Sequence, residues 1–197
     1  MKTDTSLPET RGPGRIWREW PWLAIGAAAA CALIGLVTLI VVETGVFDTA
    51  ATTPHSPLVT WATHTTMVRS VKLRAASVMP PAPFTSLQVQ AGTDIYRADC
   101  VGCHGGPATS RAPWARGLNP TPPYLLDASR HWSPPELWWI VKHGVKMTGM
   151  PGWDKSLSDG QIWDVVAFLE ALPSMPPAAF AQSPPSTPAP SGHAATR

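Results

Sequence analysis

The chain has 197 residues, enough for one or two small domains, and its 23 unevenly placed prolines indicate that much of it is not packed core. The formal net charge of +2 is small and dispersed, which argues against nucleic-acid binding because that function usually requires a clustered basic face. Of the three cysteines, Cys31 lies far from Cys100 and Cys103, so no disulfide framework is indicated. We expect one compact domain.

The N-terminal part predicts a membrane anchor. Residues 1–21 are polar and mixed in charge, and we expect them to form a cytoplasmic tail. Residues 22–42 carry no charge, and about 20 apolar helical residues are needed to cross a hydrocarbon core of about 30 Å. Tryptophans cluster at the start of this run and basic residues precede it, so the positive-inside rule places the N-terminus in the cytoplasm and the rest of the chain outside.

Two other interpretations of this apolar run are weaker. A signal peptide cleaved near residues 49–51 would have an apolar core of about 7–15 residues, which is shorter than this run. Ala29-Ala30-Cys31 resembles a lipoprotein cleavage box, but apolar sequence continues past Cys31 and the usual leucine three residues earlier is missing. We therefore expect an uncleaved transmembrane helix, with Cys31 facing lipid or a neighbouring helix.

Residues 43–85 are expected to form a periplasmic connector. Within it, residues 58–78 have moderate helical periodicity and carry Arg69, Lys72 and Arg74, which would suit contact with anionic headgroups or a docking partner. A solvated helix or an extended stalk fits equally well. Residues 79–83 predict a stiff extended hinge because proline fixes φ and removes a hydrogen-bond donor.

The compact domain is expected over residues 86–173 and contains three predicted helices. The first begins at Ser86, whose hydroxyl can cap free N–H groups, and runs into the cysteine pair. The second begins with a capping box at Ser133, where a glutamate follows three residues later, and ends near Gly144. The third begins at Ser158 with a weaker box.

The remaining segments contain no strand pattern, so the fold class is all-α. A long proline-rich loop separates the first two helices, and a loop of this length in a small domain usually has a function, such as wrapping a cofactor. Residues 174–197 are rich in Pro, Ala and Ser, and we expect them to be disordered because they bury too little apolar surface to offset the ordering entropy.

The motif Cys100-Val101-Gly102-Cys103-His104 is typical of covalent haem attachment. Two thiols one helical turn apart can bond the two vinyl groups of a haem, and the adjacent histidine can ligate the iron. A thioredoxin-like dithiol would need a surrounding βαβ pattern, and a zinc site would need a second pair of ligands. Both are missing from the sequence.

The second axial ligand is expected to be Met150. A loop between two helices, flanked by Gly149 and Pro151, can hold a side chain at the iron without disturbing a helix. Met147 is the alternative distal ligand. The remaining candidates are His131, His143, His55 and His64, although a lone histidine near a helix end is more often solvated or structurally bonded.

The chain resembles membrane-anchored, single-haem members of the class I cytochrome c family. The resemblance covers residues 86–173 and rests on the motif at 100–104, on Gly149-Met150-Pro151, on the order of the three helices and on the stretch 138–151. It implies the class I cytochrome c fold after one N-terminal transmembrane helix, and attachment of the haem on the periplasmic side.

The resemblance also implies roles for individual residues. Cys100 and Cys103 would form thioether bonds, with His104 as the proximal ligand and Met150 as the distal one. Members of the family usually orient the proximal histidine with a proline carbonyl, and Pro120, Pro122 and Pro123 are the candidates here.

Aromatic residues in or beside the predicted helices could wall the haem. Tyr96 lies just before the motif and Trp153 just after the distal loop, and Trp153 is our choice for a hydrogen bond to a haem propionate. For any one of these aromatic residues, ordinary core packing is favoured over direct contact with the haem.

The predicted function is single-electron transfer between respiratory-chain proteins by one covalently bound haem c. Two protein ligands on the iron leave no open position, so the chain is expected to be a carrier without a small-molecule substrate and not an enzyme. Its expected partners are redox proteins and the lipid bilayer, with a single-pass location in the bacterial inner membrane and the haem domain in the periplasm. The alternatives are a haem c electron-transfer subunit of a membrane oxidoreductase complex, or a haem enzyme or gas sensor with a labile distal ligand.

Overall fold

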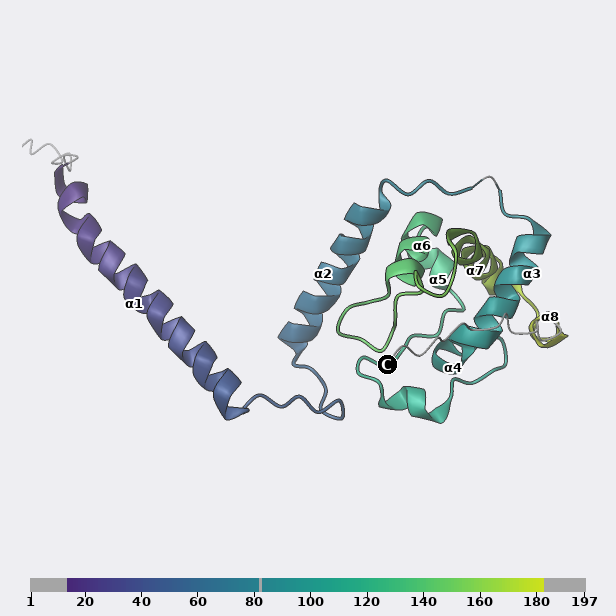
Figure 1. Ribbon diagram of the computed structural model, residues 1–197, viewed down its shortest axis with the longest axis horizontal. Coiled ribbons are helices and arrows are strands. Elements are labelled where there is room, and N and C mark those ends of the chain that lie inside the picture. Colours follow the sequence, from purple (N-terminus) through teal and green to yellow (C-terminus); the bar gives the residue numbers. More distant parts are fainter. Residues whose placement is uncertain (1–13, 82, 183–197) are drawn as a thin grey trace, which may run out of the picture. The chain divides into compact units, whose positions relative to one another are not determined.

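The computed structural model describes residues 14–81 and 83–182 (Figure 1). Within these ranges every regular element is a helix, apart from an isolated β-bridge between Gly106 and Thr109. The prediction of an all-α fold is therefore confirmed. The chain divides into two compact units between residues 50 and 51, and each unit is described by itself.

The first unit contains the long helix α1, Gly14–Thr44. Within residues 20–44 of this helix lies an apolar stretch with a mean hydropathy of 2.6, and none of that stretch is buried. By length and composition the helix is able to cross a bilayer. It begins earlier than the predicted span at 22–42, so residues 14–21 of the expected tail are helical, while residues 1–13 lie outside the described part of the chain.

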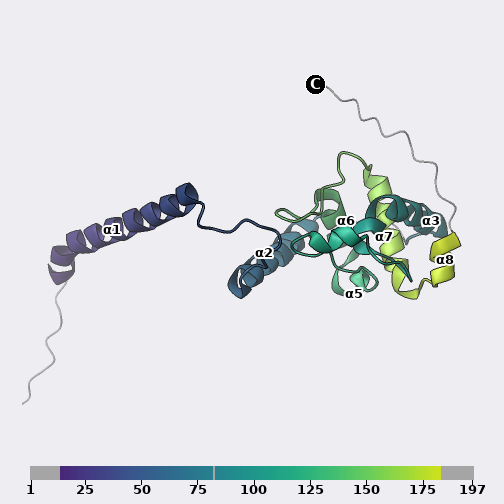
Figure 2. The same ribbon diagram turned by 90° about the horizontal axis from the view of Figure 1, so that it is seen from below.

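The second unit begins with α2, Pro57–Ala75, which lies inside the expected connector. Val71 and Ala75 on this helix are buried, and α2 packs against α6, Pro134–His143 (Figures 1 and 2). Neither a stalk nor a fully solvated helix describes this segment, because one of its faces belongs to the core. The periodicity suggested a helix here but could not show which surface would cover it.

Three capped helices build the compact domain: α3, Ser86–Ile95, then α6, and α7, Asp159–Ala171. Each begins with a capping box in which the cap hydroxyl and a side chain three residues later satisfy two free N–H groups. The pairs are Thr85 with Gln88, Ser133 with Glu136, and Ser158 with Gln161. The cap of α3 is therefore Thr85 and not the predicted Ser86, since only Thr85 places its hydroxyl before the first turn.

Helices α3 and α7 cross at close range, and the hydrophobic core is built around this crossing (Figure 2). At Gly92 on α3, a Cβ atom would lie 1.8 Å from the carbonyl oxygen of Asp164 on α7, so only glycine allows this approach. Beside the crossing, the rings of Tyr96 and Phe168 lie 4.7 Å apart between centroids. The cluster of buried residues at this crossing consists of Tyr96, Ala128, Leu137, Trp138, Val141, Ile162, Val165, Val166, Phe168, Leu169, Leu172 and Phe180.

The C-terminal end of the described chain differs from the expectation. Residues predicted to be disordered from 174 onward include a short helix, α8, Pro177–Gln182. Phe180 on α8 is 4% exposed and packs near the rings of Tyr96 and Phe168. Burying one phenylalanine contributes roughly 2 kcal/mol towards the cost of ordering this segment, and composition alone does not reveal such a tertiary contact. Residues 183–197 lie outside the described part of the chain.

Candidate cofactor site

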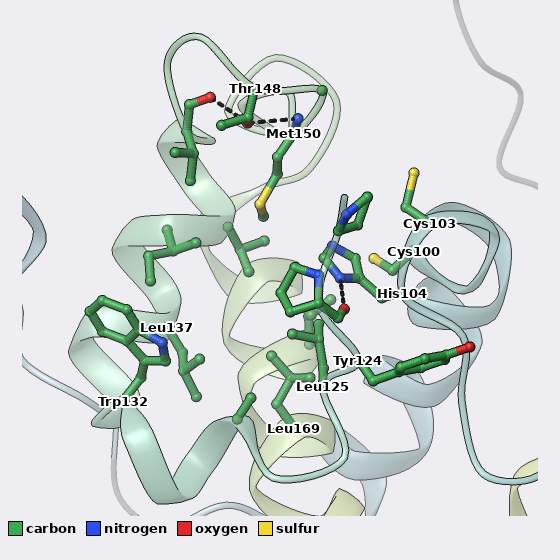
Figure 3. A pocket seen from close by; sticks show the side chains of 18 of the residues that line it. Cys100, Cys103, His104, Tyr124, Leu125, Trp132, Leu137, Thr148, Met150 and Leu169 are labelled. Atoms are coloured by element: carbon green, nitrogen blue, oxygen red, sulfur yellow. Dashed lines mark hydrogen bonds between the residues drawn. The ribbon is translucent and has the colours of Figure 1, made fainter. Parts of the chain in front are cut away.

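A cavity of about 490 Å³ lies inside the second unit (Figure 3). Its walls are mostly apolar, and helices α6 and α7 supply much of them. These two helices contribute Leu137, Ile140, Val141, Val165 and Leu169. A cavity of this size and lining is suited to a flat apolar ligand that a few polar or metal-binding groups orient.

The cysteine motif forms one wall of this cavity. After α3 the chain widens into a π-helical turn, Tyr96–Cys100, and then returns to the short helix α4, Val101–His104. Cys100, Cys103 and His104 all line the cavity, and both cysteines are free thiols (Figure 3). Burial, followed by the charges of Asp99 and Cys103, raises the pKa of the Cys100 thiol to about 12. The thiol is therefore protonated at neutral pH.

His104 is 9% exposed, and its ring orientation is fixed by a hydrogen bond. Nδ1 lies 2.8 Å from the carbonyl oxygen of Pro123, and because a carbonyl only accepts, Nδ1 carries the proton. The Nε2 lone pair remains free to bind a metal. Burial lowers the pKa of His104, the bond to Pro123 opposes this, and the charge of Arg111 lowers it further, so the neutral ring is favoured.

The structure thus distinguishes between the three candidate prolines. Pro120, Pro122 and Pro123 all line the cavity, but the carbonyl that His104 contacts belongs to Pro123. The sequence could not make this choice, because all three prolines lie in one extended loop.

Met150 reaches the cavity from the loop that follows α6 (Figure 3). The loop closes on itself, since the Val145 N–H donates to the Met150 carbonyl at 3.2 Å and the Met150 N–H donates to Thr148 Oγ1 at 3.1 Å. At its base, Gly144 has φ +65°, and a Cβ there would lie 2.4 Å from the Pro151 carbonyl carbon. The loop can therefore close only with glycine at this position.

The alternative ligand Met147 lies elsewhere. Its side chain is 85% exposed, its φ is +61°, and it does not line the cavity. Of the candidate histidines, only His131 borders the cavity, where it is exposed and has Nε2 3.4 Å from an Asp127 carboxylate oxygen. His55, His64 and His143 are not among the lining residues.

Trp153 and Tyr96, the aromatic residues named as possible haem contacts, both line the cavity. Trp153 is partly buried, and its backbone N–H donates to the Val141 carbonyl at 3.2 Å. Tyr96 is 1% exposed and donates its hydroxyl to the Gly105 carbonyl at 2.8 Å. Burial, with a smaller effect of Cys100, raises the pKa of Tyr96, so this hydroxyl stays protonated and holds the chain directly after the motif.

Two residues around the site were not predicted from the sequence. Met67 lines the cavity from α2, a helix outside the expected domain. Arg111 lies 3.9 Å from the centre of the Tyr124 ring and donates to the Pro122 carbonyl at 2.6 Å. Both residues contact parts of the site that are not adjacent to them in the sequence. No short sequence pattern around Met67 or Arg111 therefore indicates a role at the site.

The donor set suits a haem. An imidazole with a free Nε2 and a thioether face the same apolar cavity, and two free cysteines stand at its wall. This is the ligand set for a covalently held haem with histidine and methionine on the iron. In the part of the chain that the structure describes, no group of three or more His, Cys, Asp or Glu side chains is arranged to hold a metal ion directly. The cysteine pair is thus not part of such a cluster.

Comparison with known proteins agrees with this geometry. Residues 87–169 match the family described as "Cytochrome C oxidase, cbb3-type, subunit III". No curated protein matches the chain. The matched range contains the cysteine motif, Pro123, Met150 and Trp153, and domains of this kind hold haem c and transfer electrons. Residues 87–169 are therefore a c-type cytochrome domain of the cbb3-type family.

Proposed function

We propose that this protein is a membrane-tethered electron carrier with one covalently bound haem c, ligated by His104 and Met150. The observation that carries the proposal is the cavity itself, where His104 offers a free Nε2 and Met150 reaches in from a separate loop (Figure 3). The exposure of Met147 supports the choice of Met150 as the distal ligand.

Each residue has a defined task. Cys100 and Cys103 would hold the haem by two thioether bonds, each made by adding an S–H across a vinyl group, with the hydrogen passing to carbon. His104 supplies a neutral imidazole that the Pro123 carbonyl orients. Met150 supplies a soft thioether, which favours the reduced state of the iron. The apolar walls from α6 and α7 exclude water from these ligands.

Because His104 and Met150 would both bind the iron, they would leave no coordination position for a substrate. The haem, when bound, supplies reversible one-electron chemistry. The task of the protein is then to keep both ligands in place in both redox states and to present the cavity mouth to redox proteins. Such encounters are typically small and transient.

The tether is α1. Its apolar residues 20–44 are unburied, as expected of side chains that face lipid. Lys2, Arg11, Arg15 and Arg18 lie on the N-terminal side of the apolar stretch, which favours a cytoplasmic N-terminus and a haem domain on the periplasmic side of a bacterial inner membrane. Confinement to the membrane raises the effective concentration at neighbouring membrane complexes.

A second candidate is a haem c subunit of a membrane oxidoreductase complex. The matching family carries the description of an oxidase subunit, and the outer part of α2 exposes Leu58, Trp61 and Leu73, which an assembly could cover. Co-purification with other membrane proteins at fixed stoichiometry in mild detergent would favour this candidate. Recovery of a monomer that still exchanges electrons with a soluble or membrane donor would favour the carrier.

The ligand assignment is tested by comparing optical spectra of the wild type, Met150→Ala and Met147→Ala. We expect the oxidised wild type to display a sulfur-to-iron charge-transfer band, and Met150→Ala to lose the band and to bind carbon monoxide when reduced. Met147→Ala is the matched control, because it removes a thioether three residues away that faces solvent. A band that survives in Met150→Ala rules out Met150. A wild type that lacks the band and binds carbon monoxide readily would instead identify a haem enzyme or sensor.

A further inference from the structure

The segment that carries the Pro123 carbonyl has little backbone support. Residues 119–124 contain three prolines without N–H groups, and in the described part of the chain no backbone–backbone hydrogen bond joins this segment to the rest. Yet the Pro123 carbonyl accepts a 2.8 Å hydrogen bond from His104, which requires a fixed position. Something other than the backbone must therefore hold the segment.

Arg111 contacts the residues on both sides of Pro123. Its Nη1 donates to the Pro122 carbonyl at 2.6 Å, and its guanidinium carbon lies 3.9 Å from the centre of the Tyr124 ring. The Tyr124 ring in turn lies against Gly105, where an added Cβ would be 2.7 Å from a ring carbon. Gly105 directly follows His104, so these contacts connect Arg111, through Tyr124, to the residue next to the proximal histidine.

Arg111 is itself held close to the motif. The N–H of the next residue, Ala112, donates to the Gly102 carbonyl at 2.8 Å. The Arg111 Nε atom is buried and has no hydrogen-bond partner. Desolvation of this donor costs free energy, which the other contacts of the side chain must offset. A planar guanidinium can stack on a ring and donate to a carbonyl at once, which an ammonium group cannot do in the same way.

From these contacts, and resting on the proposed role of His104 as an axial ligand, we propose that Arg111 is a positioning residue for that histidine. It fixes residues 122–124 so that the Pro123 carbonyl accepts the Nδ1–H of His104. This hydrogen bond sets the ring orientation and increases the electron donation of the imidazole to the metal. Arg111 would thereby help to set the reduction potential without touching the haem.

The effect of the Arg111 charge on His104 must be separated from the effect of the Arg111 contacts, because the cation also acts on His104 at a distance. Arg111→Lys does this, since it keeps the charge but loses the stacked, forked geometry. A purely electrostatic role predicts that Arg111→Lys leaves the potential unchanged. The positioning role predicts a higher potential, because a weaker hydrogen bond makes the imidazole a poorer donor and favours the ferrous state.

The experiment uses the full-length, haem-loaded protein and measures the reduction potential and, by NMR, the solvent exchange of the His104 Nδ1 proton. In Arg111→Lys we expect the potential to rise and the exchange to speed up by about tenfold. Arg116→Lys is the matched control, since Arg116 is exposed in the neighbouring turn Pro113–Gly117. It should leave both quantities at their wild-type values.

Tyr124→Leu provides a second variant should Arg111→Lys fail to load haem. It removes the stacking surface but leaves the bond to Pro122, so a smaller change in the same direction is expected. The proposal is overturned if Arg111→Lys, or Tyr124→Leu in its place, matches Arg116→Lys in both proton exchange and potential. A wild type without histidine–methionine spectral signatures would refute the proposed function instead, and the two failures are thus distinguishable.

Discussion

Glu170 on α7 illustrates how one buried charge affects stability. Its Oε1 atom is buried without a hydrogen-bond partner, and burial raises the pKa of this carboxyl above its ordinary value of 4.5. Between the unfolded and the folded pKa the native state holds the extra proton, so the free energy of unfolding falls as pH rises through that window and stays lower above it.

Glu170→Gln should therefore stabilise the protein at neutral pH. Glutamine carries no charge to desolvate, and after solvent screening we expect a gain of less than about 1 kcal/mol. The gain should vanish well below pH 4.5, where Glu170 is protonated in both states. Denaturant titrations across this pH range measure the effect, with Asp154→Asn as a control because Asp154 is an exposed carboxylate beside Lys155. An equal gain at all pH values would contradict this explanation.

At the scale of single residues, the sequence predicted those whose chemistry depends on local spacing. Cys100, Cys103 and His104 were predicted because covalent attachment requires their order, and Met150 because a loop with Gly149 and Pro151 can present a ligand. All four line one cavity, and their roles at a haem stay predictions. Pro123 could not be chosen among its neighbours, and Arg111 and Met67 were not found. Their roles depend on how the loop and α2 fold back, which no short pattern encodes.

At the scale of elements, the crossing of α3 and α7 depends on Gly92. A Cβ at this position would lie 1.8 Å from the Asp164 carbonyl oxygen and 3.0 Å from the Phe168 Cβ, so the two helices must separate to accept it. We expect Gly92→Ala to cost about 3 kcal/mol, which is at the upper end for overpacking. The loss should appear as a lower denaturation midpoint and poorer haem loading.

A matched control for this variant is Gly117→Ala. Gly117 lies in the exposed turn before Leu118, and nothing lies within 4 Å of an added Cβ. Its stability should change by no more than about 0.5 kcal/mol, as at other surface positions. If Gly92→Ala were equally mild, the close approach of the helices would not be needed for folding.

The helices themselves were predictable where their start signals are local. The boxes at Ser133 and Ser158 place α6 and α7 correctly, since each cap satisfies its own first turn. The cap of α3 was wrong by one residue, because Thr85 and Ser86 are adjacent hydroxyl residues and both are able to cap. α8 was missed because its order depends on Phe180 reaching the core, which is a tertiary contact.

At the scale of the whole molecule, α2 extends the domain beyond the residues that the family match covers. The match begins at residue 87, yet Val71 and Ala75 are 1% and 3% exposed against α6, and Met67 lines the cavity. The proline-containing stretch 79–83, predicted to be a hinge, lies between α2 and α3 in the sequence. An element attached by one buried face and a hinge is suited to open by itself, without global unfolding.

Val71→Asp tests whether α2 closes the cavity. A buried, unpaired carboxylate in place of a packed valine should cost about 3 kcal/mol and release α2 from α6, exposing the cavity wall near Met67. Hydrogen exchange should then accelerate in α2 while α3 and α7 stay protected, and the reduction potential should fall as water approaches the metal. Leu73→Asp is the control, because Leu73 is 76% exposed on the same helix. If both variants exchange alike, α2 does not depend on its buried face, and the cavity is enclosed by the matched domain alone.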